Sequence, residues 1–137
     1  MVGRGGIFLN MQLALMHNTD SVTRYWAAIG LRNQKTIELN ENTLWQLFNA
    51  EKSDLVKIEL ADILYTKFNS EQALFWLPQL IETTDNSYFA WQAATKLENY
   101  KNMPQALLKK MEVLYQNGST YAIRAAIGTL LNKNVAE

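Results

Sequence analysis

The sequence contains no cysteine, only two prolines and a single histidine. The absence of cysteine excludes disulfide bonds, cysteine–zinc sites and catalysis by a thiol. His17 is the lone histidine, and Asn18 and Asp20 beside it do not form the oriented set of partners that acid–base catalysis or zinc binding requires. We therefore expect His17 to be a solvated turn residue, and we expect no catalytic residue, no cofactor and no metal site. The chain is predicted not to be an enzyme.

An excess of charge of one sign is also lacking, because thirteen basic residues balance thirteen acidic ones. Proteins that bind nucleic acid by neutralising phosphates carry a basic excess, so we expect no nucleic-acid partner. No apolar stretch approaches the roughly 20 residues needed to span a bilayer, so we expect no membrane partner. The expected partner is a protein, and the sequence leaves the oligomeric state open.

The most informative feature that is present is an internal repeat. Four stretches resemble one another, and counting from one aligned position the steps are 33, 33 and 34 residues; that position is occupied by Arg24, Lys57, Ala90 and Arg124. Such a fixed period indicates a stack of two-helix units, each unable to bury its apolar side alone. No alternating strand pattern of useful length occurs. We predict an all-α fold, a right-handed α-solenoid in a single domain 1–137, with four units at about 7–33, 40–66, 71–99 and 103–132.

The apolar positions predict which helix faces are buried. Four residues after the aligned position each second helix carries a small residue, which close helix packing requires: Ala28, Ala61, Ala94 and Gly128. Three residues further on each carries a leucine: Leu31, Leu64, Leu97 and Leu131. The first helices are expected to bury matching stripes: Met11, Ala14 and Leu15, then Leu44, Leu47 and Phe48, then Leu77, Leu80 and Ile81, and finally Met111, Leu114 and Tyr115.

Polar turns precede the second helices and offer Ser, Thr or Asp side chains to the free N–H groups of each helix start. Arg24 follows the first of these turns. We expect it to have a structural role, bonding to neighbouring turns.

The four tryptophans divide into two groups. Trp45, Trp76 and Trp91 are expected in the core or between units. Trp26 lies two residues after the aligned position, where the other units carry Glu59, Gln92 and Ala126. That substitution pattern favours an exposed side chain, and together with Tyr25 it predicts an aromatic contact surface at the N-terminal end, with Phe8 as a further partner contact. The alternative is that the first helix, 7–16, covers Trp26.

The repeat units resemble the HEAT-type repeats of bacterial proteins. The resemblance rests on a polar turn, a basic residue at the start of the second helix, then alanines and a leucine, as in Thr23-Arg24, Ala27-Ala28 and Leu31. The third unit departs with Ala90 at the basic position, and the period is shorter than that of the larger HEAT units. More specifically, the segment from Leu13 to Leu31 is similar to the start of the helical tail that follows the catalytic domain in some bacterial sulfatases. Neither the nucleophile motif nor the calcium-binding cluster of sulfatases is present.

This resemblance implies a non-catalytic protein-interaction or scaffolding module, a detached copy of such a tail, which docks a sulfatase-like catalytic domain through its N-terminal end. It would be periplasmic if it is a sulfatase tail, and otherwise cytoplasmic. Two alternatives stay open. A nucleic-acid-binding helical-repeat protein would need a basic concave face, which the zero net charge disfavours. A bilin-lyase-like HEAT repeat protein would need a chromophore pocket with acid–base residues.

Overall fold

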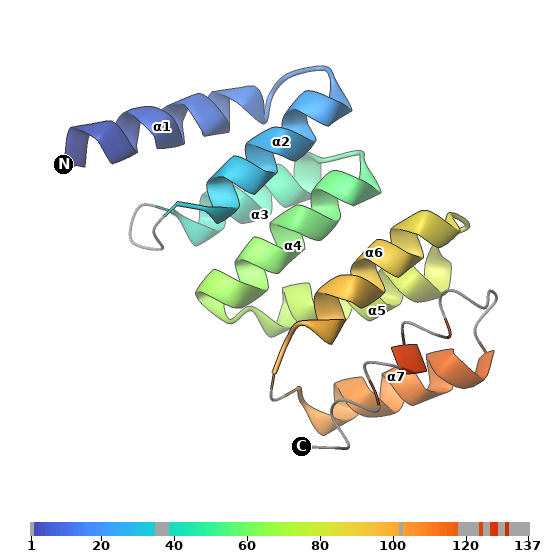
Figure 1. Ribbon diagram of the computed structural model, residues 1–137. Coiled ribbons are helices and arrows are strands. Elements are labelled where there is room, and N and C mark those ends of the chain that lie inside the picture. The colour runs from blue at the N-terminus through green and yellow to red at the C-terminus, as the bar shows by residue number, and fades with distance from the viewer. Residues whose placement is uncertain are drawn as a thin grey trace. The chain divides into compact units, whose positions relative to one another are not determined.

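The computed structural model describes residues 2–34, 39–101 and 103–117, together with residues 124, 127, 128 and 131. The secondary structure in this part of the chain consists of helices without any strand, which confirms the predicted all-α class (Figure 1). None of the described helices is both long enough and apolar enough to cross a membrane. The helices are α1 (Val2–Leu15), α2 (Ser21–Arg32), α3 (Glu41–Ala50), α4 (Asp54–Phe68), α5 (Glu71–Thr83), α6 (Ser87–Glu98) and α7 (Gln105–Asn117).

The chain divides into two compact units, Met1–Ala73 and Leu74–Glu137, which we call unit 1 and unit 2. Unit 1 contains two helical hairpins, α1–α2 and α3–α4 (Figure 1). Within it α1 packs on α2, α3 packs on α4, and the two hairpins meet mainly through α2 and α4.

Polar side chains begin several of the helices; the predicted Ser, Thr or Asp cap is confirmed for α2, whereas α6 is capped by an asparagine instead. Asp20 accepts a hydrogen bond from the backbone N–H of Thr23 at the start of α2, and Asn86 does the same for two N–H groups of α6. Ser53 occupies the corresponding position before α4, but its side chain makes no capping hydrogen bond. At the other end of α4, Asn69 adopts a left-handed conformation with φ of 56°, which closes the helix and turns the chain towards α5.

The predicted buried positions of the second helices are confirmed in α2, α4 and α6. The small residues Ala28, Ala61 and Ala94 have no exposed surface, and neither have the leucines that follow them, Leu31, Leu64 and Leu97. Because alanine has a small side chain, the backbones of neighbouring helices can approach each other closely at this position. The leucine, about one turn further along the helix, fills the space between the helices there. At the fourth aligned site, Gly128 and Leu131 are half-buried.

The apolar stripes of the first helices are confirmed for α3 and α5 but are wrong for α1. Met11 is 55% exposed and Leu15 38% exposed, and Ala14 is exposed as well. The side chains that α1 turns inward lie two positions earlier: Leu9, Gln12 and Leu13. The cause is the turn length, because the α1–α2 turn covers residues 16–20 whereas the α3–α4 turn covers only 51–53. Two extra turn residues shift the buried face of α1 by two positions.

Unit 2 contains α5 from Leu74 onward, α6 and α7. Its predicted core residues Leu77, Leu80, Ile81 and Met111 are buried. The expectation for Trp91 is wrong, because its side chain is 42% exposed. Trp91 follows the buried Ala90 by one residue, and one residue along a helix rotates a side chain by about 100° away from the buried stripe. Trp45 and Trp76 are half-buried.

Candidate protein-interaction surface

Trp26 is the most exposed large apolar side chain among the described residues, at 64% of its surface. This confirms the predicted outward direction, and the alternative that α1 covers Trp26 is wrong. Tyr25 is half-buried beside it, with the two rings edge to face and 5.5 Å between their centroids. Phe8 belongs to α1, but its side chain lies outside the part of the structure that is described.

Three further residues of unit 1 expose large apolar side chains: Met11 at 55%, Leu15 at 38% and Val22 at 60%. Met11 and Leu15 lie one turn apart on α1, and Val22 and Trp26 lie one turn apart on α2, so each pair points in one direction. We call the surface formed by Met11, Leu15, Val22 and Trp26 the end face. It contains every large apolar side chain that is exposed in the described part of unit 1.

The two pairs form one continuous surface because of the way α1 and α2 meet. The side chain of Gln12 lies against Gly30, where an added Cβ would come within 2.5 Å of the Gln12 Cδ atom. The two helices of a hairpin run in opposite directions, so three residues forward along α1 correspond to about three or four residues backward along α2. Counted from the contact between Gln12 and Gly30, Leu15 and Trp26 therefore lie at nearly the same level along the hairpin axis.

The end face also lies on the side of α1 and α2 that is opposite the second hairpin. On α1, Leu9 and Leu13 point towards Leu44 of α3, with which they line a small gap of about 50 Å³. On α2, Arg24 and Arg32 point towards the second hairpin. The exposed apolar residues therefore point away from α3 and α4.

The end face carries no charge. From Gly5 to Thr19 the chain has no Asp, Glu, Lys or Arg, and the arginines of α2 are directed to the other side of the helix. Depletion of charged residues is what distinguishes the core of a protein interface from ordinary surface. Of these four exposed side chains, the sequence pattern predicts Trp26 but not Met11, Leu15 or Val22. The long uncharged run from Gly5 to Thr19 is a signal that could have revealed Met11 and Leu15, whereas Val22 lies outside it.

A buried ion pair holds this region together. The Arg24 Nε atom donates to both carboxylate oxygens of Glu51 at 2.7 and 2.8 Å, and its Nη1 atom donates to the backbone carbonyls of Asn18 and Thr19 at 2.8 and 3.0 Å. The side chain of Glu51 is 3% exposed and that of Arg24 is 15% exposed. Arg24 thus ties the α1–α2 turn to the α3–α4 turn, which confirms its predicted structural role.

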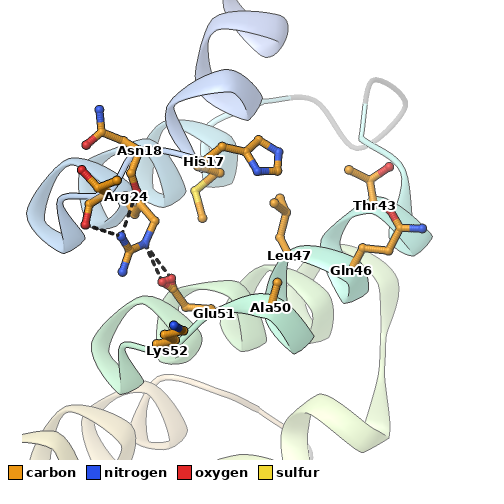
Figure 2. Close-up of a pocket in the computed structure, with 11 residues that line it drawn as sticks. His17, Asn18, Arg24, Thr43, Gln46, Leu47, Ala50, Glu51 and Lys52 are labelled. Carbon is orange, nitrogen blue, oxygen red and sulfur yellow. Dashed lines mark hydrogen bonds and ion pairs between the residues drawn. The ribbon is translucent and has the colours of Figure 1, made fainter.

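A cleft of about 680 Å³ opens next to this ion pair, between the α1–α2 turn and α3 (Figure 2). His17 is exposed at its edge, in the turn where the sequence places it. Within the described ranges, no group of three or more His, Asp or Glu side chains is arranged to hold a metal ion. The lining residues are Met16, His17, Asn18, Thr19, Arg24, Thr43, Gln46, Leu47, Ala50, Glu51 and Lys52.

A second set of charges lies between α2 and α4. Arg32 approaches Glu59 at 3.5 Å and Asp62 at 3.9 Å, and both carboxylates are buried, at 4% and 6% exposure. The hairpins of unit 1 are therefore joined by charged pairs as well as by buried apolar side chains, whereas the outer surface of α1–α2 is apolar.

Comparison with protein-family models, with curated proteins and with solved structures finds no match to this chain. The resemblance to HEAT-type repeats and to sulfatase tails is therefore an expectation from the motif residues alone, above all from the segment Leu13 to Leu31. That segment includes three of the four residues of the end face, Leu15, Val22 and Trp26.

Proposed function

We propose that this protein is a non-catalytic interaction module, a right-handed α-solenoid of four HEAT-like two-helix units that docks a protein partner through the end face. The observation that carries the proposal is the gathering of Met11, Leu15, Val22 and Trp26 on one uncharged surface. Scattered single apolar residues on a surface need no explanation, but a contiguous patch without charges is typical of a binding site.

The end face has the composition of an interface centre. Tryptophan and tyrosine are enriched among the few residues that supply most of the binding free energy, and Trp26 of the end face has the ring of Tyr25 beside it. Methionine adapts to irregular partners because its side chain is unbranched and polarizable. The helices beneath are held by the buried Leu31 and by the Arg24–Glu51 pair, so little conformational freedom would be lost on docking.

The partner suggested by the resemblance is a sulfatase-like catalytic domain. The segment that resembles the sulfatase tail is also the segment that supplies most of the end face, which supports docking through this surface. If catalytic domain and helical tail belong to one chain, the linkage raises their effective concentration, and a modest intrinsic affinity is sufficient.

The test is a binding measurement between this chain and the catalytic domain encoded in the same or the adjacent reading frame. Truncation of a central interface tryptophan costs about 2 kcal/mol or more, so Trp26→Ala should weaken binding by roughly 30-fold. Val113→Ala is the matched control, because Val113 is 58% exposed but lies on α7 in unit 2. If Trp26→Ala binds with unchanged affinity, the end face is not the docking surface. If the neighbouring reading frame encodes no sulfatase domain, the suggested partner is wrong.

A further inference from the structure

The cleft beside the Arg24–Glu51 pair is separate from the end face and has the features of a second binding site. Its volume of about 680 Å³ lies within the range of roughly 300–1,000 Å³ that is usual for ligand sites. It lies on the side of the α1–α2 hairpin that faces α3, whereas the end face points away from α3.

The walls of the cleft are fixed before any ligand arrives. Arg24 holds the carbonyls of Asn18 and Thr19 on one wall and the carboxylate of Glu51 on the other, all within 3.0 Å. A guanidinium group is planar, and four hydrogen bonds leave it a single orientation. Binding in this cleft would therefore not require the two turns to become ordered.

The lining combines an apolar floor with a polar rim. Met16 and Leu47 are buried at 5% and 9% exposure and form apolar surface, while Thr43 and Gln46 lie on α3 with side chains that make no hydrogen bond to another described residue (Figure 2). A hydroxyl and an amide offer both donors and acceptors, which match the alternating N–H and C=O groups of an extended peptide.

The charge of the lining decides which peptide fits. The carboxylate of Glu51 is matched by Arg24, so these two charges cancel within the cleft. Lys52 is exposed at the edge and forms no ion pair with another described residue. The lining consequently has one cationic group to offer and no carboxylate without a partner.

We propose that this cleft binds an extended peptide segment of a protein partner, with an apolar side chain on Met16 and Leu47 and an acidic side chain next to Lys52. The backbone of the segment is hydrogen-bonded by Thr43 and Gln46. The site is independent of the end face, so the chain has two separate surfaces for protein contact.

The test is a titration of the isotope-labelled full-length chain, followed by NMR, with the blocked peptide acetyl-Leu-Asp-Leu-Thr-amide. Matched peptides carry Asn or Lys in place of Asp. The backbone signals of Thr43, Gln46 and Lys52 should shift, and the Asn peptide should bind about twofold to fivefold more weakly, as expected for one exposed ion pair. The Lys peptide should be the weakest of the three.

Lys52→Glu should reverse that order, while Lys101→Glu, an exposed lysine of unit 2, should leave it unchanged. Trp26→Ala should also leave peptide binding unchanged, which separates this proposal from the one on the end face. Equal binding of all three peptides, an order unaffected by Lys52→Glu, or signals of the cleft that do not move would overturn it.

Discussion

Helices α2 and α4 carry opposite kinds of residue at matching positions of the repeat. Trp26 on α2 is 64% exposed, whereas Glu59, at the aligned position of α4, is 4% exposed. Each inverts the usual preference of tryptophan for the interior and of glutamate for the surface. On α4 this position faces α2, and Glu59 meets Arg32 there; on α2 the same position faces away from the second hairpin. A repeat position is therefore buried or exposed according to whether a neighbouring helix lies on that side.

The first helices show the same contrast. With the two-residue shift caused by the longer turn, Met11 and Leu15 of α1 match Gln46 and Ala50 of α3. Gln46 and Ala50 line the cleft and face the α1–α2 turn, while Met11 and Leu15 face outward. The end face thus corresponds to the surface with which the second hairpin meets the first, and it is the more apolar of the two, because Met11 and Trp26 occupy the positions of Gln46 and Glu59. This correspondence is why we regard it as a docking surface.

The largest effect is expected on the inner side of α2. Leu31 has no exposed surface, so Leu31→Ala should leave a cavity and lower the free energy of unfolding by about 3–5 kcal/mol, measured by urea denaturation. Leu15→Ala removes the same atoms from a side chain that is 38% exposed, and it should lower the free energy of unfolding by only about 1 kcal/mol. Equal losses from the two variants would show that the end face is covered within the folded chain.

The next effect concerns the ion pair that joins the two hairpins. Glu51→Ala would leave the largely buried guanidinium of Arg24 without its carboxylate partner. Breaking a fully buried pair in this way lowers the free energy of unfolding by about 3–5 kcal/mol. We expect about 2–4 kcal/mol here, because the side chain of Arg24 is 15% exposed. Glu82→Ala is the control, since its pair with Lys110 at 3.5 Å is exposed and should contribute less than about 1 kcal/mol. If Glu51→Ala lowers the free energy of unfolding no more than Glu82→Ala does, water takes the place of the missing carboxylate beside Arg24.

A reciprocal exchange tests the comparison of α2 with α4 directly. Glu59→Trp places a large ring in a buried site beside Arg32 and should lower the free energy of unfolding by about 1–3 kcal/mol. Trp26→Glu makes α2 resemble α4 at the aligned position and should change stability by less than about 0.5 kcal/mol. Thermal unfolding of the two variants side by side is the measurement. Similar losses would mean that the two positions have similar environments.

Sequence reasoning was most successful where packing repeats. The alanine and leucine positions of the second helices, such as Ala61 and Leu64, were predicted correctly because every unit needs a close helix contact at the same place. The outward direction of Trp26 was predicted from its mismatch with the other units, and the structural role of Arg24 from its place after a turn. These inferences depend only on periodicity and on local chemistry.

The errors arose where one turn differs from the others. Nothing in the residue types announces that the α1–α2 turn is two residues longer, so the face of α1 that carries Met11 and Leu15 was assigned to the interior. The cleft was also beyond prediction, because its walls come from two hairpins and are joined by the pairing of Arg24 with Glu51, 27 positions apart in the sequence. Contacts of that kind depend on how two hairpins pack, which periodicity does not specify.

The smallest effect distinguishes the starts of α2 and α4. The hydroxyl of Thr23 donates to the Asp20 carboxylate at 2.8 Å and its backbone N–H donates at 3.2 Å, and these bonds lower the pKa of Asp20 below its ordinary value of 3.8. Because the pKa is lower in the folded state, this stabilisation is complete above the unfolded pKa of about 3.9 and is lost as the pH falls through the folded value.

Asp20→Ala should therefore reduce stability at neutral pH, and its difference from the parent chain should narrow once the carboxylate of the parent is protonated. Ser53→Ala should have little effect at either pH, because the Ser53 side chain makes no capping bond at the start of α4. Urea denaturation at about pH 6 and at about pH 2.5 measures the stability of both variants, and an NMR titration of the parent chain measures the pKa of the Asp20 carboxyl. A pH-independent difference for Asp20→Ala would assign the effect to the backbone turn rather than to the charge.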